Sequence, residues 1–451
     1  MLTAHRVRTS LVIAASAATV IAALLLSARG GPSVVVPSEA DDGMQLVARL
    51  TTSNILAGPH EQDLAVTITA PRGAAHERPP ISLAVVIDRS GSMSGEPIQN
   101  AKAAAARLIG QLGPTDAFTV ITYSSADEVV MPMARATDAN KQRARDAIAR
   151  IIDAGATCIS CGLSRGAAEL ARSPIDGGLR RIVLISDGQA NAGVYDRGEL
   201  IDLAAQTAAI GDSITALGVG LDFDEQTMMK IAEVGRGNYY FVEDTANLVS
   251  IFERELGGLT ETVASNVRLV LSDGPGVRIE EALGYPMVRS GSSVVIPIAD
   301  LRAGESRKVV LRVTVAARAT GPFVISQVHL GWRRVTDGLQ RKAQAVAQVE
   351  VVDDPAAVAS SVDVAATQAV EEALSAKALQ DATTVYETQG ADAANAVLQQ
   401  RVQAVRANAY ARPETVEKID RAAGEAMDSF KTSAPAKAKK VSGKAAFELA
   451  R

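Results

Sequence analysis

The stretch Ile81-Ser-Leu-Ala-Val-Val-Ile-Asp-Arg-Ser-Gly-Ser-Met93 decides the fold of this chain. Residues 81–87 form a short, nearly all-apolar run rich in β-branched side chains, which is typical of a central parallel strand buried on both faces. A turn follows, and from residue 98 to residue 112 the apolar residues recur on one face of a helix. Three polar side chains, Asp88, Ser90 and Ser92, should therefore project from a strand-to-helix loop at the carboxyl edge of a parallel sheet. Open α/β sheets bind ligands at this edge.

These oxygen-bearing side chains suit a hard cation such as Mg²⁺, which prefers oxygen ligands in octahedral geometry. Asp-x-Ser-x-Ser alone would equally fit a capped helix start, because Asp and Ser are common capping residues. Two later stretches favour the metal. Thr157 precedes a helical pattern that starts near residue 159, and a second buried strand over residues 182–186 is followed by Asp187.

Residues 81–256 resemble a von Willebrand factor type A (VWA) domain of the bacterial, membrane-anchored type. The metal-ion-dependent adhesion site of that family combines Asp-x-Ser-x-Ser with a later Thr and a later Asp. Within this range, further segments also resemble recurring segments of the family: residues 93–98, 116–124, 185–191, 217–220 and 237–242. It implies that Ser90, Ser92 and Thr157 contact the metal, and that Asp88 and Asp187 bind it directly or through water. Cys158 stands where the family often has Asn, and Arg89 follows the first Asp, but neither departure removes a ligand.

Such a site predicts binding rather than catalysis. Two carboxylates and three neutral hydroxyls leave Mg²⁺, or another divalent cation such as Mn²⁺ or Ca²⁺, with a coordination position open to water or to a Glu or Asp of a partner protein. The stretches that converge here offer no His as a general base, and the sequence has no phosphate loop, His-Glu-x-x-His or Gly-x-Ser-x-Gly motif. We therefore predict that the protein is not an enzyme.

The first residues predict export. Arg6 and Arg8 precede an uncharged apolar run, residues 11–28, which would be about 27 Å long as a helix, close to the roughly 30 Å of a membrane's hydrocarbon core. We favour an uncleaved anchor, because signal peptides have shorter apolar regions and Leu26 fits a cleavage site poorly. A cleaved signal peptide, and hence secretion, is the alternative. Either way the bulk of the chain would lie outside the cytoplasm, in the cell envelope or periplasm.

Alternating strands and helices predict an α/β fold with a doubly wound, mostly parallel sheet of about six strands. Further strands are predicted at residues 118–123, 181–186, 213–219 and 239–242, and helices at residues 138–152, 159–171, 199–209, 224–234 and 245–256. Short β-rich segments on both sides of this domain predict a β-sandwich, with the α/β domain inserted between its second and third strands. The alternative is two unrelated β pieces.

The composition then shifts to Ala, Glu, Gln and Lys, which predicts a small helical bundle and a basic, disordered tail. The predicted domains are an anchor or signal peptide at 1–30, a linker at 31–43, sandwich segments at 44–80 and 263–353, the VWA domain at 81–257, the bundle at 355–430 and the tail at 431–451.

Cys158 and Cys161 are the only cysteines, and both lie beside Thr157. In an exported protein a Cys-x-x-Cys pair is expected to be oxidised, so we predict a disulfide that stiffens the metal loop. A redox-active pair is the alternative, because a helix N-terminus lowers the pKa of a thiol. Zinc would need about four ligands, and the four His residues lie elsewhere in the sequence.

We expect an exported, membrane-tethered module that binds an acidic residue of a protein partner through the metal. Two other functions stay open: a structural envelope protein whose metal only stabilises the loops, and a VWA subunit that works with an ATPase. The net charge of −5 and the lack of a basic stripe argue against a nucleic-acid partner.

Overall fold

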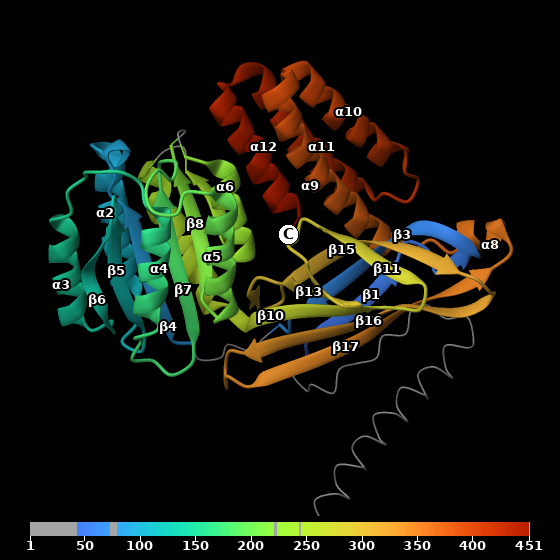
Figure 1. Cartoon of the computed structure of the whole chain (residues 1–451), viewed down its shortest axis with the longest axis horizontal. Coiled ribbons are helices and arrows are strands. Elements are labelled where there is room, and N and C mark those ends of the chain that lie inside the picture. Colours follow the sequence, from blue (N-terminus) through green and yellow to red (C-terminus); the bar gives the residue numbers. More distant parts are fainter. Residues whose placement is uncertain (1–42, 73–78, 221–222, 243–244, 451) are drawn as a thin grey trace, which may run out of the picture.

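The computed structural model describes residues 43–72, 79–220, 223–242 and 245–450. Residues 1–30, predicted as an anchor or signal peptide, and all but the last residue of the predicted linker lie outside this range. Within the described ranges, no helix is both long and apolar enough to span a membrane. Figure 1 shows an α/β domain at the left, a β-sandwich at the lower right and a group of C-terminal helices above the sandwich.

The α/β domain is built on a six-stranded sheet with the order β6-β5-β4-β7-β8-β9. Five strands are parallel, and β6 runs antiparallel to β5 at one edge. The strands are β4 (Ile81–Asp88), β5 (Ala117–Tyr123), β6 (Asp127–Arg135), β7 (Leu179–Ser186), β8 (Ser213–Val219) and β9 (Arg236–Val242). The mostly parallel sheet is confirmed, although β6 was not among the predicted strands. Every residue of β4 is buried, as predicted for the apolar run at 81–87, because β4 lies between β5 and β7 and is covered on both faces.

Helices cover both faces of this sheet, so the domain has two apolar cores. One face carries α2 (Glu96–Gln111), α3 (Asp138–Ala149) and α7 (Leu248–Thr260), and the other carries α4 (Ile159–Leu170), α5 (Arg197–Ala209) and α6 (Glu225–Val234). Two short 3₁₀ helices are η1 (Gly91–Met93) and η2 (Thr245–Asn247). Gly162 lets α4 approach the sheet closely, since a Cβ there would lie 2.7 Å from the ring of Tyr123.

The β-sandwich has one four-stranded sheet, β1-β3-β15-β11, and a second sheet in which β12-β13-β10-β16-β17-β2 are neighbours and β14 pairs with β10. Its strands are β1 (Gln45–Leu50), β2 (Asn54–Leu56), β3 (Gly58–Thr69), β10 (Thr262–Asp273), β11 (Val277–Leu283), β12 (Val288–Ser290), β13 (Ser293–Pro297), β14 (Leu301–Arg302), β15 (Ser306–Ala317), β16 (Gly321–Arg334) and β17 (Gln340–Val352). The two sheets share one core around Trp332, so the flanking β segments are not unrelated pieces. The α/β domain follows the third strand of the sandwich. The prediction placed it after the second strand because it missed β2.

Five helices follow the sandwich: α8 (Pro355–Ala359), α9 (Val364–Gln389), α10 (Ala391–Ala407), α11 (Pro413–Thr432) and α12 (Pro435–Leu449). The prediction of a disordered tail is wrong for its described part, because residues 435–449 form α12. A face of small and apolar side chains holds this helix against α9 and α11. Its members include Ala438, Ser442, Ala446 and Leu449.

Helix α12 also contacts the α/β domain, next to α6 in Figure 1. Lys440 is buried, and its Nζ donates to the carbonyl of Phe223 at 3.1 Å while lying 3.8 Å from the centre of that residue's ring. The rings of Tyr239 and Phe447 meet edge to face at 6.0 Å. The C-terminal helices are therefore joined to the inserted domain by a buried cation and an aromatic pair.

Candidate metal-binding site

Asp88 ends β4 and lies completely buried at the carboxyl edge of the sheet. Its Oδ1 accepts a hydrogen bond from the backbone N–H of Ser90 at 2.8 Å, and its Oδ2 accepts one from the Ser186 hydroxyl at 2.8 Å. The hydroxyl oxygens of Ser90 and Ser92 are 3.1 Å apart. The turn after β4 thus folds both serines back around the carboxylate that precedes them.

Asp187 and Thr157 approach the same place from two other loops. The Ser92 hydroxyl donates to Oδ1 of Asp187 at 2.8 Å. A Cβ on Gly188 would lie 3.2 Å from Oγ1 of Thr157 and 3.4 Å from Oγ of Ser92, so both hydroxyls border this glycine. The structure therefore brings all five predicted site residues together where β4 and β7 end. Their role as metal ligands stays a prediction.

Backbone hydrogen bonds hold the three loops in register. The N–H of Gly91 donates to the carbonyl of Gly155 at 3.1 Å, which ties the serine loop to the threonine loop. Asn191 and Thr157 are joined twice: the Asn191 side chain accepts from the Thr157 N–H at 2.7 Å, and the Asn191 N–H donates to the Thr157 carbonyl at 3.0 Å. These bonds position the Thr157 hydroxyl without using it.

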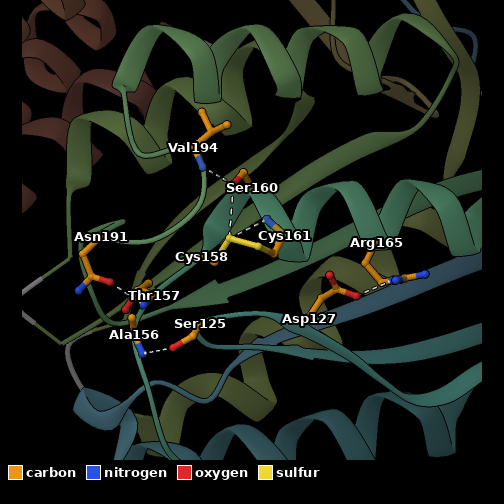
Figure 2. The surroundings of a disulfide bond; sticks show 10 residues. All are labelled: Ser125, Asp127, Ala156, Thr157, Cys158, Ser160, Cys161, Arg165, Asn191 and Val194. Carbon is orange, nitrogen blue, oxygen red and sulfur yellow. Dashed lines mark hydrogen bonds and ion pairs between the residues drawn. A yellow bond between two sulfur atoms is a disulfide. The ribbon is translucent and has the colours of Figure 1, made fainter.

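A disulfide between Cys158 and Cys161 begins α4 directly beside Thr157 (Figure 2). The loop after Asp187 packs on it: the N–H of Val194 donates to the Ser160 hydroxyl at 3.0 Å, and a Cβ on Gly193 would overlap Sγ of Cys158. The disulfide is therefore a structural support shared by the loops that carry Thr157 and Asp187. The alternative of a redox-active pair stays a prediction.

The electrostatics of the site suit a cation. Burial raises the pKa of Asp88, while hydrogen bonds from Ser90 and Ser186 act in the opposite direction. Burial, together with the nearby Asp88 carboxylate, raises the pKa of Tyr123 well above its usual value. The groups that hydrogen-bond Asp88 are neutral, so its charge would be compensated by a divalent ion rather than by a neighbouring Arg or Lys.

The donor set also selects the class of ion. Carboxylate and hydroxyl oxygens are the ligands of hard cations such as Mg²⁺. In the described part of the chain, no group of three His, Cys, Asp or Glu side chains could hold a metal. That result fits a site in which two carboxylates act together with three hydroxyls. The residues present therefore fit Mg²⁺ or a similar ion.

Three supporting residues were not predicted from the sequence. Ser186 donates to Asp88, Asn191 holds Thr157, and the Tyr123 hydroxyl donates to the carbonyl of Ile185 at 2.9 Å. All three belong to segments on which the resemblance rests. The role of Ser186 could have been predicted from its position at the end of a buried strand, directly before Asp187.

A family model for the von Willebrand factor type A domain matches residues 82–254. Among curated proteins, YfbK of Escherichia coli is 27% identical over 225 residues, which is 49% of this chain and 39% of that protein. The protein sll0103 of Synechocystis is 24% identical over 293 residues, or 62% of this chain and 69% of that one. Both relatives are called uncharacterized in their names, and this chain spans 39% of the length of the first.

Solved structures share the fold over most of the chain. A von Willebrand factor type A protein from Catenulispora acidiphila superposes with a TM-score of 0.70 at 18% identity and covers 86% of this chain and 92% of its own. The ArnB paralog VWA2 from Sulfolobus acidocaldarius gives a TM-score of 0.61 at 16% identity, over 90% of this chain and 99% of its own. The family model assigns residues 82–254 of this chain to the VWA domain, and the solved structures share its fold.

Proposed function

We propose that this protein binds a partner protein through a divalent cation held where β4 and β7 end. The observation that carries the proposal is the meeting of five oxygen-bearing side chains from three separate loops where β4 and β7 end: Asp88, Ser90, Ser92, Thr157 and Asp187. Proteins with this domain typically mediate protein–protein interaction. When bound, the cation would supply a coordination position for an Asp or Glu of the partner.

The surrounding residues prepare the site for that cation. Ser186 and the N–H of Ser90 fix the orientation of the Asp88 carboxylate, and Ser92 fixes that of Asp187. Asn191 accepts a hydrogen bond from the backbone N–H of Thr157, so the Thr157 hydroxyl remains available as a ligand. Because the oxygen ligands are already gathered, little ordering free energy would be lost when the ion binds.

We also propose that the chain is exported and tethered to a membrane through residues 1–30. The apolar run in the sequence supports this, and the disulfide beside the site is the form expected in an oxidising compartment. A reporter fused after Arg451 should be active outside the cytoplasm. Activity only inside the cytoplasm would favour the VWA subunit that works with an ATPase.

Calorimetric titration with Mg²⁺ tests the metal site. Wild-type protein should bind the ion, and Asp187→Asn should abolish the signal, whereas the exposed Asp176→Asn should behave as wild type. Capture of partners from envelope extract should then need Mg²⁺ and fail with chelator. If Asp187→Asn lowers the melting temperature of the metal-loaded protein but leaves capture intact, the metal has a structural role and the proposal is wrong.

A further inference from the structure

A cavity of about 370 Å³ lies beside the loop that carries Asp88 and Ser90. It is open to solvent and lined by the carboxyl end of β5, the beginning of β6 and residues at and after the end of α3. Its polar lining comes from Arg89, Thr122, Glu128 and Arg150, and its apolar lining includes Ile151 and the exposed Ile152. We refer to it as the Arg89 pocket.

Arg89 connects this pocket to the candidate metal site, because it stands between Asp88 and Ser90 in the sequence. Its backbone is fixed on both sides: its N–H donates to the carbonyl of Tyr123 at 2.9 Å, and its carbonyl accepts from the N–H of Ala154 at 2.7 Å. Any ligand held by the Arg89 side chain would therefore lie next to the metal loop itself.

The Arg89 guanidinium is only weakly engaged. One terminal nitrogen donates to the Ile152 carbonyl at 3.4 Å, and the other lies 3.7 Å from the carboxylate of Glu128, whose side chain is 65% exposed. Its Nε is buried and has no hydrogen-bond partner among the described residues. A guanidinium has five N–H donors, four of them on the terminal nitrogens, and the Arg89 side chain is 23% exposed, so these nitrogens retain unused capacity for a carboxylate.

Arg150 supplies a second cation in the same pocket. It follows α3 and is exposed, so its guanidinium can reach an incoming carboxylate. Thr122 also lines the pocket, but its hydroxyl is completely buried and does not donate to a ligand there.

We propose that the Arg89 pocket is a second carboxylate subsite, which takes an acidic side chain from the same partner segment whose other acidic residue binds the metal. This inference rests on the proposed function. Two arginines face one carboxylate in the lining, so the pocket carries a net positive charge. Arg89 and Arg150 supply donors for the incoming carboxylate, and the aliphatic wall suits its methylene groups. The preferred partner is therefore a segment with two neighbouring acidic residues.

The test compares acetate with a series of dicarboxylates from succinate to pimelate, each titrated into the full chain with saturating Mg²⁺. Affinity is measured by calorimetry, and the Nε–H signal of Arg89 is followed by NMR. At least one dicarboxylate should bind about tenfold more tightly than acetate, because the second contact becomes intramolecular. Its titration should shift the Arg89 signal.

Two variants and one control make the assignment specific. Arg89→Gln should bring the ratio of dicarboxylate to acetate affinity close to one, whereas Arg143→Gln, an exposed residue of α3 outside the pocket, should keep the wild-type ratio. Arg150→Gln should lower the ratio severalfold, because it removes the second positive charge of the lining.

The outcomes separate the two proposals. If acetate binds only with Mg²⁺ and no dicarboxylate binds more tightly, the subsite is refuted and the proposed function stands. If dicarboxylates bind in an Arg89-dependent manner that chelator does not change, the metal-linked function is refuted, and the link between the pocket and the metal is refuted with it. If neither acetate nor any dicarboxylate binds, both proposals are wrong.

Discussion

Replacing Glu225 by Gln should make the stability of this protein less dependent on pH between about 4.5 and 7. Glu225 is the first residue of α6 and is only 8% exposed, because α12 covers it. Gly443 of α12 lies so close that a Cβ there would overlap the Glu225 carboxylate. Burial raises the pKa of Glu225 from 4.5 to about 7; nearby Lys440 and Lys439 lower it, and two other carboxylates raise it further.

The sign follows from the two pKa values. Between about pH 4.5 and 7 the unfolded chain has lost the Glu225 proton while the folded protein keeps it, so stability falls as the pH rises through this range. Below it, both states are protonated and the group contributes no difference. The full loss amounts to about 3 kcal/mol, since one pH unit of pKa difference equals about 1.4 kcal/mol.

Glu225→Gln cannot ionise, so its advantage over wild type should grow from near zero at pH 4.5 to about 1–3 kcal/mol at pH 8. The lower figure allows for Lys440, which loses a nearby negative charge while remaining buried against Phe223. Urea unfolding at a series of pH values measures the difference. The exposed Glu417→Gln in α11 is the control and should follow wild type. Parallel pH profiles for Glu225→Gln and wild type would refute the reasoning.

Three further predictions concern other parts of the molecule. Gly162→Ala should cost about 1–3 kcal/mol in urea unfolding, because the added Cβ would meet the Tyr123 ring, whereas Gly424→Ala in α11, where the described residues leave open space, should gain about 0.5–1 kcal/mol. Replacing Cys158 and Cys161 together by Ser should lower the unfolding free energy by about 2 kcal/mol, as the chain-entropy model gives for so short a loop, and reduction should have no effect on that variant. Mg²⁺ at one hundred times its Kd should stabilise the wild type by about 2.7 kcal/mol and Asp187→Asn not at all; equal melting shifts would contradict metal binding at this residue.

The α/β domain could be predicted because its signal is local. Buried parallel strands are continuous apolar runs, and each predicted strand of the sheet lies within one residue of the observed element or inside it. The site could be predicted for a related reason. Asp88 and Asp187 each stand at the end of such a run, and the carboxyl ends of neighbouring parallel strands meet at one edge.

The sandwich was predicted only in outline, because its missing strands depend on distant partners. Residues 54–56 begin with Asn, directly follow Thr52 and Ser53, and stand two positions before Gly58, a composition typical of a turn. They form β2 because they pair in parallel with Glu350–Val352 of β17, nearly three hundred residues later. A short strand of this kind is stabilised by its neighbour rather than by its own composition.

Helix α12 was missed because its lysines favour disorder by composition. The structure shows that Lys440 is buried, with its ammonium group against the carbonyl and ring of Phe223. A buried Lys needs such partners, and the sequence cannot show that they lie 217 positions away. The same helix then creates the environment that shifts the pKa of Glu225.

Pro132 explains why β6 was not predicted, since proline inside an apparent strand argues against a central strand. The structure tolerates it because β6 pairs only with β5, and because the register shifts near Val120. The start of this edge strand forms a wall of the Arg89 pocket, so that pocket could not be predicted from the sequence.

In the sequence, Arg89 was only a departure from the family pattern. A metal ion accepts a carboxylate from any acidic residue, so discrimination between partners has to come from groups beside the metal. Arg89 lies at such a position, between Asp88 and Ser90. It departs from the family pattern, and its pocket is formed in part by β6, which was not predicted from the sequence.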